Sequence, residues 1–212
     1  MHINIFVVII ILTVFYMATV KRITSLINGF LVQSLFISLY VFSEGVLTKN
    51  MELYSVAFIL FLLKVIVIPL TLRQLVKNIK ADENAGLLIS PVISLIFAAI
   101  LAGFSYEFAD KIMPLQGKHL IGAFSISLFI TLVGMFLMIF RKKAISQIIG
   151  LLVMENGLFL LAAEAAGGLP FFIEITIFFD ILVSVMILGV FVYRINSLFT
   201  HIDTNKLTRL KG

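Results

Sequence analysis

The stretch "IIGLLVMENGLFLLAAEA", residues 148–165, is almost entirely apolar, yet it carries Glu155 and Asn156 in its middle. A run of this length approaches the roughly 20 mostly apolar residues that a helix needs to cross a bilayer. A carboxylate at the centre of such a helix is costly unless it faces protein or a water-filled passage. The depth of Glu155 in the membrane therefore bears on both the fold and the function.

The whole chain has the composition of an integral membrane protein. Of its 212 residues, 61% are apolar and 13% are charged, with a mean hydropathy of +1.17, and a water-soluble core could not hide so much apolar surface. The net charge of +5 comes from short basic clusters between apolar runs, which argues against nucleic-acid binding. The absence of cysteine excludes disulfides and thiolate-held clusters within this chain, and the three histidines are too far apart to predict a metal site. We expect no cofactor in this chain.

The apolar runs predict an all-α integral membrane protein with seven transmembrane helices. The runs are continuous and lack the alternation of β-barrel strands. We divide the chain into an N-terminal four-helix region, residues 1–112, and a C-terminal three-helix region, residues 113–212. The seven spans lie roughly at 3–20, 23–43, 53–72, 87–108, 119–140, 144–166 and 171–193.

The lysines and arginines divide unequally between the two sides of the membrane. Twelve lie in loops on one side and three on the other, while Lys64 lies inside the third span. The positive-inside rule then places the N-terminus outside and the C-terminus in the cytoplasm. The twelve are Lys21, Arg22, Arg73, Lys77, Lys80, Arg141, Lys142, Lys143, Arg194, Lys206, Arg209 and Lys211; the three are Lys49, Lys111 and Lys118.

Three ionisable side chains are expected near the middle of the membrane. At 1.5 Å per residue, Glu155 and Lys64 lie about 16 Å and Asp180 about 14 Å inside a hydrocarbon core about 30 Å thick. Glu164 and Glu174 form a second tier near the outer surface, where interfacial acids can reach water.

Ionisable groups at such depth mark ion pathways and proton relays by default. Burial and neighbouring opposite charge push protonation in opposite directions, so Lys64, Glu155 and Asp180 at one level can exchange protons or switch partners. The alternative is a static buried ion pair, supported by hydrogen bonds from Asn156, that only fixes helix packing. Both interpretations remain open from the residues alone.

Two further patterns concern helix packing. Gly150 and Gly157 lie two helical turns apart and predict a close helix contact. Pro69 predicts either a kink near Lys64 or the frayed end of the third span. Residues 21–32 match residues 142–153 at six of twelve positions, including Gly29 with Gly150. This predicts a parallel repeat in which Glu155 corresponds to Ser34.

Several stretches resemble the hydrogenase-4 component E family. They are "LKVIVIPLTLRQLVKNI" (63–79), "QIIGLLVMENGLFL" (147–160), "FIEITIFFDILVSVMILGVFVYR" (172–194) and the tail "HIDTNKLTRLKG" (201–212). The resemblance implies a non-catalytic, multi-pass subunit of a complex I-like assembly in the prokaryotic inner membrane. It also implies partners: antiporter-like and complex I-like membrane subunits and a peripheral nickel–iron hydrogenase or formate dehydrogenase arm, which would carry the electron transfer.

The last hundred residues also resemble the small three-helix (NuoK-type) subunit of respiratory complex I. The segment "IMPLQGKHLIGAF" (112–124) looks like its start, and Asp180 matches the glutamate on its third helix. The resemblance implies that Asp180 and an acid in the sixth span belong to a buried polar axis for protons. The first glutamate of that subunit aligns with Leu152, whereas the acid here is Glu155, on nearly the same face and about 4.5 Å deeper.

The residues and the resemblance together predict a subunit of a redox-driven proton or cation pump. In this interpretation Glu155 and Asp180 carry the charge and Lys64 modulates it. A subunit of a multisubunit sodium/proton antiporter would use the same acids without a redox arm. A purely structural membrane adaptor would need no ion movement.

Overall fold

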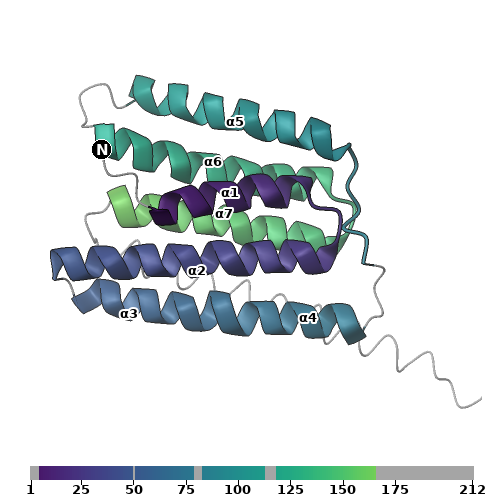
Figure 1. The fold of residues 1–212 in the computed structure, drawn as a ribbon, viewed down its shortest axis with the longest axis horizontal. Coiled ribbons are helices and arrows are strands. Elements are labelled where there is room, and N and C mark those ends of the chain that lie inside the picture. Colours follow the sequence, from purple (N-terminus) through teal and green to yellow (C-terminus); the bar gives the residue numbers. More distant parts are fainter. Residues whose placement is uncertain (1–4, 50, 79–82, 113–117, 166–212) are drawn as a thin grey trace, which may run out of the picture.

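The computed structural model describes residues 5–49, 51–78, 83–112 and 118–165, and every regular element within these ranges is a helix. The helices lie nearly parallel to one another, and α3, η1 and α4 follow without a break as one rod (Figure 1). In chain order they are α1 (Ile5–Thr19), α2 (Ile23–Thr48), α3 (Met51–Leu60), the π-helix η1 (Phe61–Val67), α4 (Ile68–Asn78), α5 (Pro91–Ile112), α6 (Lys118–Phe140) and α7 (Ala144–Ala165).

The described residues contain five helices long and apolar enough to cross a membrane, together with the shorter apolar α1. The chain is therefore a multi-pass membrane protein, and each of the first six predicted spans corresponds to a helical rod. The rods α2 and α3–α4 extend past the predicted ends at 43 and 72, because hydropathy marks contact with hydrocarbon and not the end of a helix. The predicted seventh span, 171–193, lies outside the described residues. The orientation and the division at residue 112 remain predictions.

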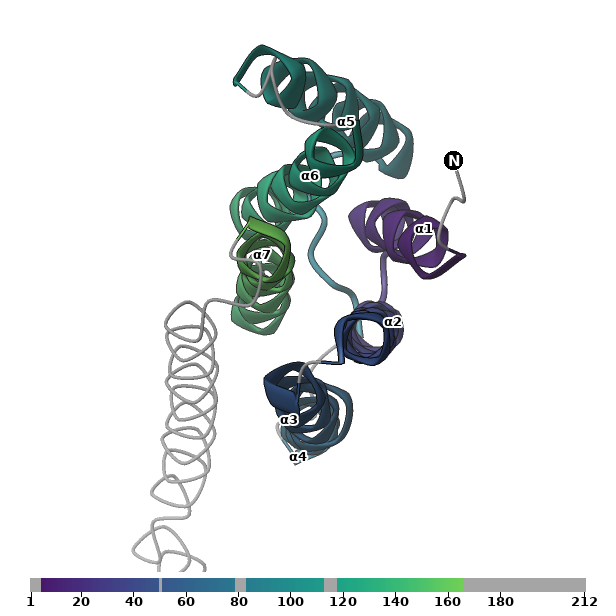
Figure 2. The same ribbon diagram turned by 90° about the vertical axis from the view of Figure 1, so that its left-hand side faces the viewer.

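The helices form two rows, α5–α6–α7 and α1–α2–α3/α4, when the bundle is viewed end-on (Figure 2). Glycines allow α6 and α7 to approach closely. A Cβ atom on Gly134 would lie 2.6 Å from Met154 Cα, one on Gly150 would lie 2.9 Å from Met138 N, and one on Gly157 would lie 2.6 Å from Thr131 N. The close contact predicted at Gly150 and Gly157 is confirmed, with Gly134 as its counterpart on α6.

The row α1–α2–α3/α4 also has a glycine contact, between α1 and α2. A Cβ atom on Gly29 of α2 would lie 2.6 Å from Met17 Cγ of α1. In the register of the predicted repeat, Gly29 corresponds to Gly150, and α1–α2 corresponds to α6–α7. Both aligned glycines contact the preceding helix, but Gly29 meets the Met17 side chain whereas Gly150 meets the α6 backbone, so the repeat stays a prediction.

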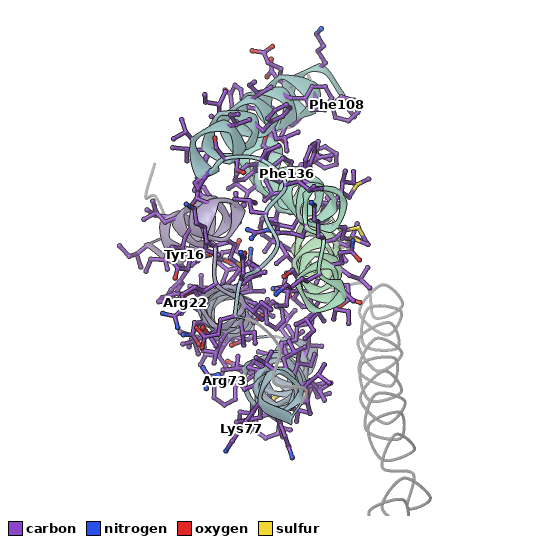
Figure 3. All side chains as sticks on the ribbon, turned by 90° about the vertical axis from the view of Figure 1, so that its right-hand side faces the viewer. Tyr16, Arg22, Arg73, Lys77, Phe108 and Phe136 are labelled. Atoms are coloured by element: carbon purple, nitrogen blue, oxygen red, sulfur yellow. The ribbon has the colours of Figure 1, made fainter. Side chains whose placement is uncertain are left out.

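The connections at one end of the bundle bind the two rows together. We call this the basic end, because it exposes Lys21, Arg22, Arg73, Lys77 and Lys142; Figure 3 looks onto it, and Arg22, Arg73 and Lys77 are labelled there. The segment 83–88 lies between the other two connections. Ile23 N donates to Glu83 O (2.8 Å) and Ala85 N to Lys21 O (2.6 Å), while Lys142 N donates to Gly86 O (2.9 Å).

Arg141 closes the same end from inside the protein. Its side chain is only 1% exposed, and it donates from Nη1 to Val20 O (2.7 Å) and from Nη2 to Met17 O (2.9 Å). These carbonyls lie at the C-terminal end of α1, where a helix lacks intrahelical donors and attracts positive charge. Burial lowers the pKa of Arg141 to about 10, which leaves the guanidinium protonated at neutral pH. The desolvation cost decreases only when the pH rises above about 10, so Arg141 adds no pH dependence to stability near neutrality.

Gly134→Ala should destabilise the bundle by about 1–3 kcal/mol, because the new methyl group meets the backbone of α7 and forces the helices apart. Thermal unfolding in detergent micelles measures this loss. Gly103→Ala is the matched control, since nothing lies within 4 Å of the added Cβ atom there. Equal midpoints for the two variants would contradict the close α6–α7 contact.

Arg141→Met should cost about 2–3 kcal/mol, because two carbonyl oxygens near the end of α1 lose hydrogen bonds from a charged donor. The same unfolding assay applies, with Lys142→Met as the control, since Lys142 is exposed and its replacement should change stability by less than about 0.5 kcal/mol. If Arg141→Met unfolds at the same temperature as the Lys142→Met control, the Arg141 side chain does not stabilise the end of α1.

Candidate functional site

Lys64 lies at the centre of the π-helix η1 and is only 2% exposed. The Ile68 N–H bonds to Leu63 O, five residues back, where an α-helix would use Lys64 O. The following residue, Pro69, explains this wider turn. In an α-helix its ring would clash with the carbonyl four residues earlier, and the π turn relieves that clash before α4 resumes. The sequence-predicted kink at Pro69 thus takes the form of a π-helix that carries the buried lysine.

Asn156 of α7 links Lys64 to a third helix. Lys64 Nζ donates to Asn156 Oδ1 at 3.0 Å. Asn156 Nδ2 donates in turn to Gln33 Oε1 (3.2 Å) and to Ser34 Oγ (3.1 Å), both on α2. All four residues are buried, and we call them the polar hub (Gln33, Ser34, Lys64 and Asn156). One amide group therefore joins α2, η1 and α7 in the middle of the bundle.

Glu155 adjoins the polar hub and is also only 2% exposed. The glycine contact determines the direction in which it points. Gly157 faces α6, and a residue two positions earlier is rotated by about 200° around the helix, so Glu155 points away from α6. The structure thus brings an acid and a lysine from different helices to one level, as their sequence depths predict.

The polar hub and Glu155 offer two kinds of chemistry. The Lys64 amino group and the Glu155 carboxyl group can each bind and release a proton, whereas the Asn156 amide does not titrate and links Lys64 to α2 by hydrogen bonds. Because charge is costly in an apolar interior, a change in protonation at one group alters the energy of the others. The arrangement therefore suits either a proton-coupled step or a fixed polar clasp.

Sequence reasoning missed two members of the polar hub, Gln33 and Ser34. Ser34 could have been singled out, because it aligns with Glu155 in the register of the predicted repeat. Gln33 is one of the few amides inside an apolar run, but its depth alone does not show which helix it faces. Asn156 was expected to supply hydrogen bonds to a buried ion pair, and in the structure it accepts a hydrogen bond from Lys64 and also donates to α2.

Three other predicted residues cannot be placed at this site. Asp180 and Glu174 lie outside the described residues, and Glu164 falls in the last turn of α7 at a position where only the backbone is described. Among the residues that the structure describes, no group of three or more histidine or acidic side chains has the arrangement of a metal site.

Asn156→Leu should lower stability by about 2–4 kcal/mol, because it removes one acceptor of the buried Lys64 Nζ group and the donor to Gln33. Thermal unfolding in detergent measures the change, and Leu158→Ala on the exposed side of α7 serves as the control. If both variants unfold at the temperature of the unaltered chain, the polar hub does not hold the helices together.

Comparison with known proteins gives distant relatives. The chain is 26% identical to the uncharacterized protein Rv0085 of Mycobacterium tuberculosis over 169 residues, which cover 79% of this chain and 77% of that protein. It is 26% identical to hydrogenase-4 component E of Escherichia coli K12 over 152 residues, 72% of this chain and 70% of the relative, and the same values hold for the Shigella flexneri protein. No family model matches the chain, and no solved structure matches it. The sequence resemblance to hydrogenase-4 component E thus has support across most of the chain, as distant similarity.

Proposed function

We propose that this chain is a hydrogenase-4 component E-like subunit of a redox-driven, ion-translocating complex in the prokaryotic inner membrane. Glu155 and Lys64 form the part of its ion path within the described residues, and Asp180 is a further member. The electron transfer belongs to partner subunits, which we expect to include a nickel–iron hydrogenase or formate dehydrogenase arm and antiporter-like membrane subunits.

One observation carries this proposal: two oppositely charged side chains and an amide lie buried at one level of a membrane bundle. Lys64 Nζ lies 3.0 Å from Asn156 Oδ1, and Glu155 precedes Asn156 in the same turn of α7. Intramembrane ionisable groups are expensive and are kept mainly where charge or protons move. The distant similarity to hydrogenase-4 component E connects this site with a hydrogenase-type complex.

A structural adaptor is the second candidate, and the direct hydrogen bonds of Asn156 favour it. They join three helices without any intermediary, as a static clasp would. Under this alternative Glu155 and Lys64 only fix the packing, and their neutralisation affects stability but not ion movement. Measurement of ion movement therefore separates the two candidates.

Glu155→Gln should abolish proton or cation translocation while electron transfer from donor to acceptor continues, because the amide keeps the shape but cannot exchange a proton. The assay uses the intact complex in sealed vesicles and records turnover and pH or cation gradients together. Glu107→Gln is the matched control, because Glu107 is exposed near the end of α5. Asp180→Asn should behave like Glu155→Gln.

Assembly of each variant is checked by subunit composition after purification. Full translocation in an assembled Glu155→Gln complex would overturn the proposed role and favour the adaptor. A complex that translocates ions but contains no hydrogenase or dehydrogenase subunit would indicate a sodium/proton antiporter instead.

A further inference from the structure

The buried face of α2 changes character at the polar hub. Between the hub and the basic end, the buried side chains on this face are apolar: Ile23, Leu26, Ile27 and Phe30. From Ser34 of the hub onward, the same face carries Ser38 and Tyr40, both buried, and the half-buried Glu44, interspersed with Ile37 and Val41. Successive residues are rotated by about 100°, so both sets fall within one sector of the helix, and the contrast lies along its length.

The helices that pack around this face also close its basic half. The buried residues of α4 there are Ile68, Leu72, Leu75 and Val76, and those of α7 include Ile149, Leu152 and Val153. Ser146 is a polar exception at the start of α7, but its hydroxyl donates to Ala85 O at 2.9 Å. Several layers of apolar side chains therefore separate the polar hub from the basic end.

Polar atoms of α2 offer further hydrogen bonding on the other side. Gln33 is fully buried, and its Nε2 donates to no atom within the described residues, although a buried amide N–H usually has an acceptor. The Ser38 hydroxyl donates to Leu35 O at 2.9 Å, which leaves its oxygen able to accept. Such hydrogen-bonding groups can bind the water molecules that accompany a proton or a small cation.

We infer that the ion path proposed above opens from the polar hub along α2 toward the end opposite the basic end, and is closed on the basic side. This inference rests on the proposed function. Its members are Ser34, Ser38, Tyr40 and Glu44, the polar stripe of α2, with Gln33 as the donor at its inner end. The hydroxyls of Ser34 and Ser38 lie one turn apart, about 6 Å along the axis, a gap that one bridging water spans. Glu44 supplies an acid at the outer end of the stripe, where it attracts cations.

Cysteine reactivity tests the stripe directly, because the chain contains no cysteine of its own. Ser38→Cys and Ser34→Cys are near-isosteric changes on the polar side, and Ile27→Cys, two turns before Ser34 on the same face, is the matched control on the basic side. Each variant is purified as the intact complex and exposed to silver ion, a small water-borne cation that binds thiolates. Silver bound to the thiolate blocks its later alkylation. The unalkylated fraction of the peptide that carries the cysteine is then measured by mass spectrometry.

The thiolate is the reactive form, and a dry apolar site raises the thiol pKa, each unit of which lowers the thiolate fraction about tenfold. We expect silver to protect Ser38→Cys and Ser34→Cys at least about tenfold faster than Ile27→Cys. Equal rates at all three positions, whether fast or slow, would overturn the inference, as would faster reaction at Ile27→Cys.

The thiol readout does not depend on transport. If Glu155→Gln stops translocation but the three cysteines react alike, the path exists and does not follow α2. If the stripe reacts selectively while Glu155→Gln still translocates ions, the water-accessible stripe exists and the proposed role of Glu155 fails.

Discussion

The hydrogen bond between Lys64 and Asn156 is the constraint on which the rest of the bundle depends. An ammonium group 2% exposed among apolar helices requires an acceptor, and Asn156 Oδ1 provides one at 3.0 Å. The same amide uses its nitrogen for Gln33 and Ser34, so α2, η1 and α7 cannot rotate independently without loss of a buried hydrogen bond. In a membrane, where apolar side chains gain little by contacting each other instead of lipid, such bonds and close backbone packing specify which helices meet.

Two features of the backbone support that constraint from opposite sides. On α7, Gly150 and Gly157 let α6 approach until a Cβ atom would collide with its backbone, and this contact turns Glu155 away from α6. On the third rod, Pro69 ends the α-helical register and the π turn before it holds Lys64 toward α7. Glycine and proline, which usually weaken helices, here determine the direction in which two charged side chains point.

The sequence predicted the features that depend on composition and on distance along a helix. The six helical rods of the described residues follow from hydropathy, and the common depth of Lys64 and Glu155 follows from the rise per residue. The close contact at Gly150 and Gly157 follows from their spacing. Contacts between helices did not follow, because the rotation of each helix depends on packing: Gln33 was missed, and Asn156 was expected to support a buried ion pair, without its hydrogen bonds to α2. The structural role of Arg141 was also missed, since a basic residue in a loop predicts orientation and gives no sign that it is buried against α1.

The two ends of the bundle use polar groups in different ways. At the basic end, backbone hydrogen bonds among three connections and the buried Arg141 fix the ends of α1, α2, α6 and α7, and apolar layers separate them from the polar hub. Opening this end would break the backbone hydrogen bonds of the connections and the two bonds from the Arg141 Nη atoms. Toward the other end, the buried face of α2 retains hydroxyl groups, and Gln33 Nε2 makes no hydrogen bond within the described residues. In the proposed path, buried hydroxyl groups follow α2 on only one side of the polar hub, so an ion enters from one direction and no open pore forms. This asymmetry is what a coupled pump requires of a half-path, since a continuous polar route through both halves would dissipate the gradient.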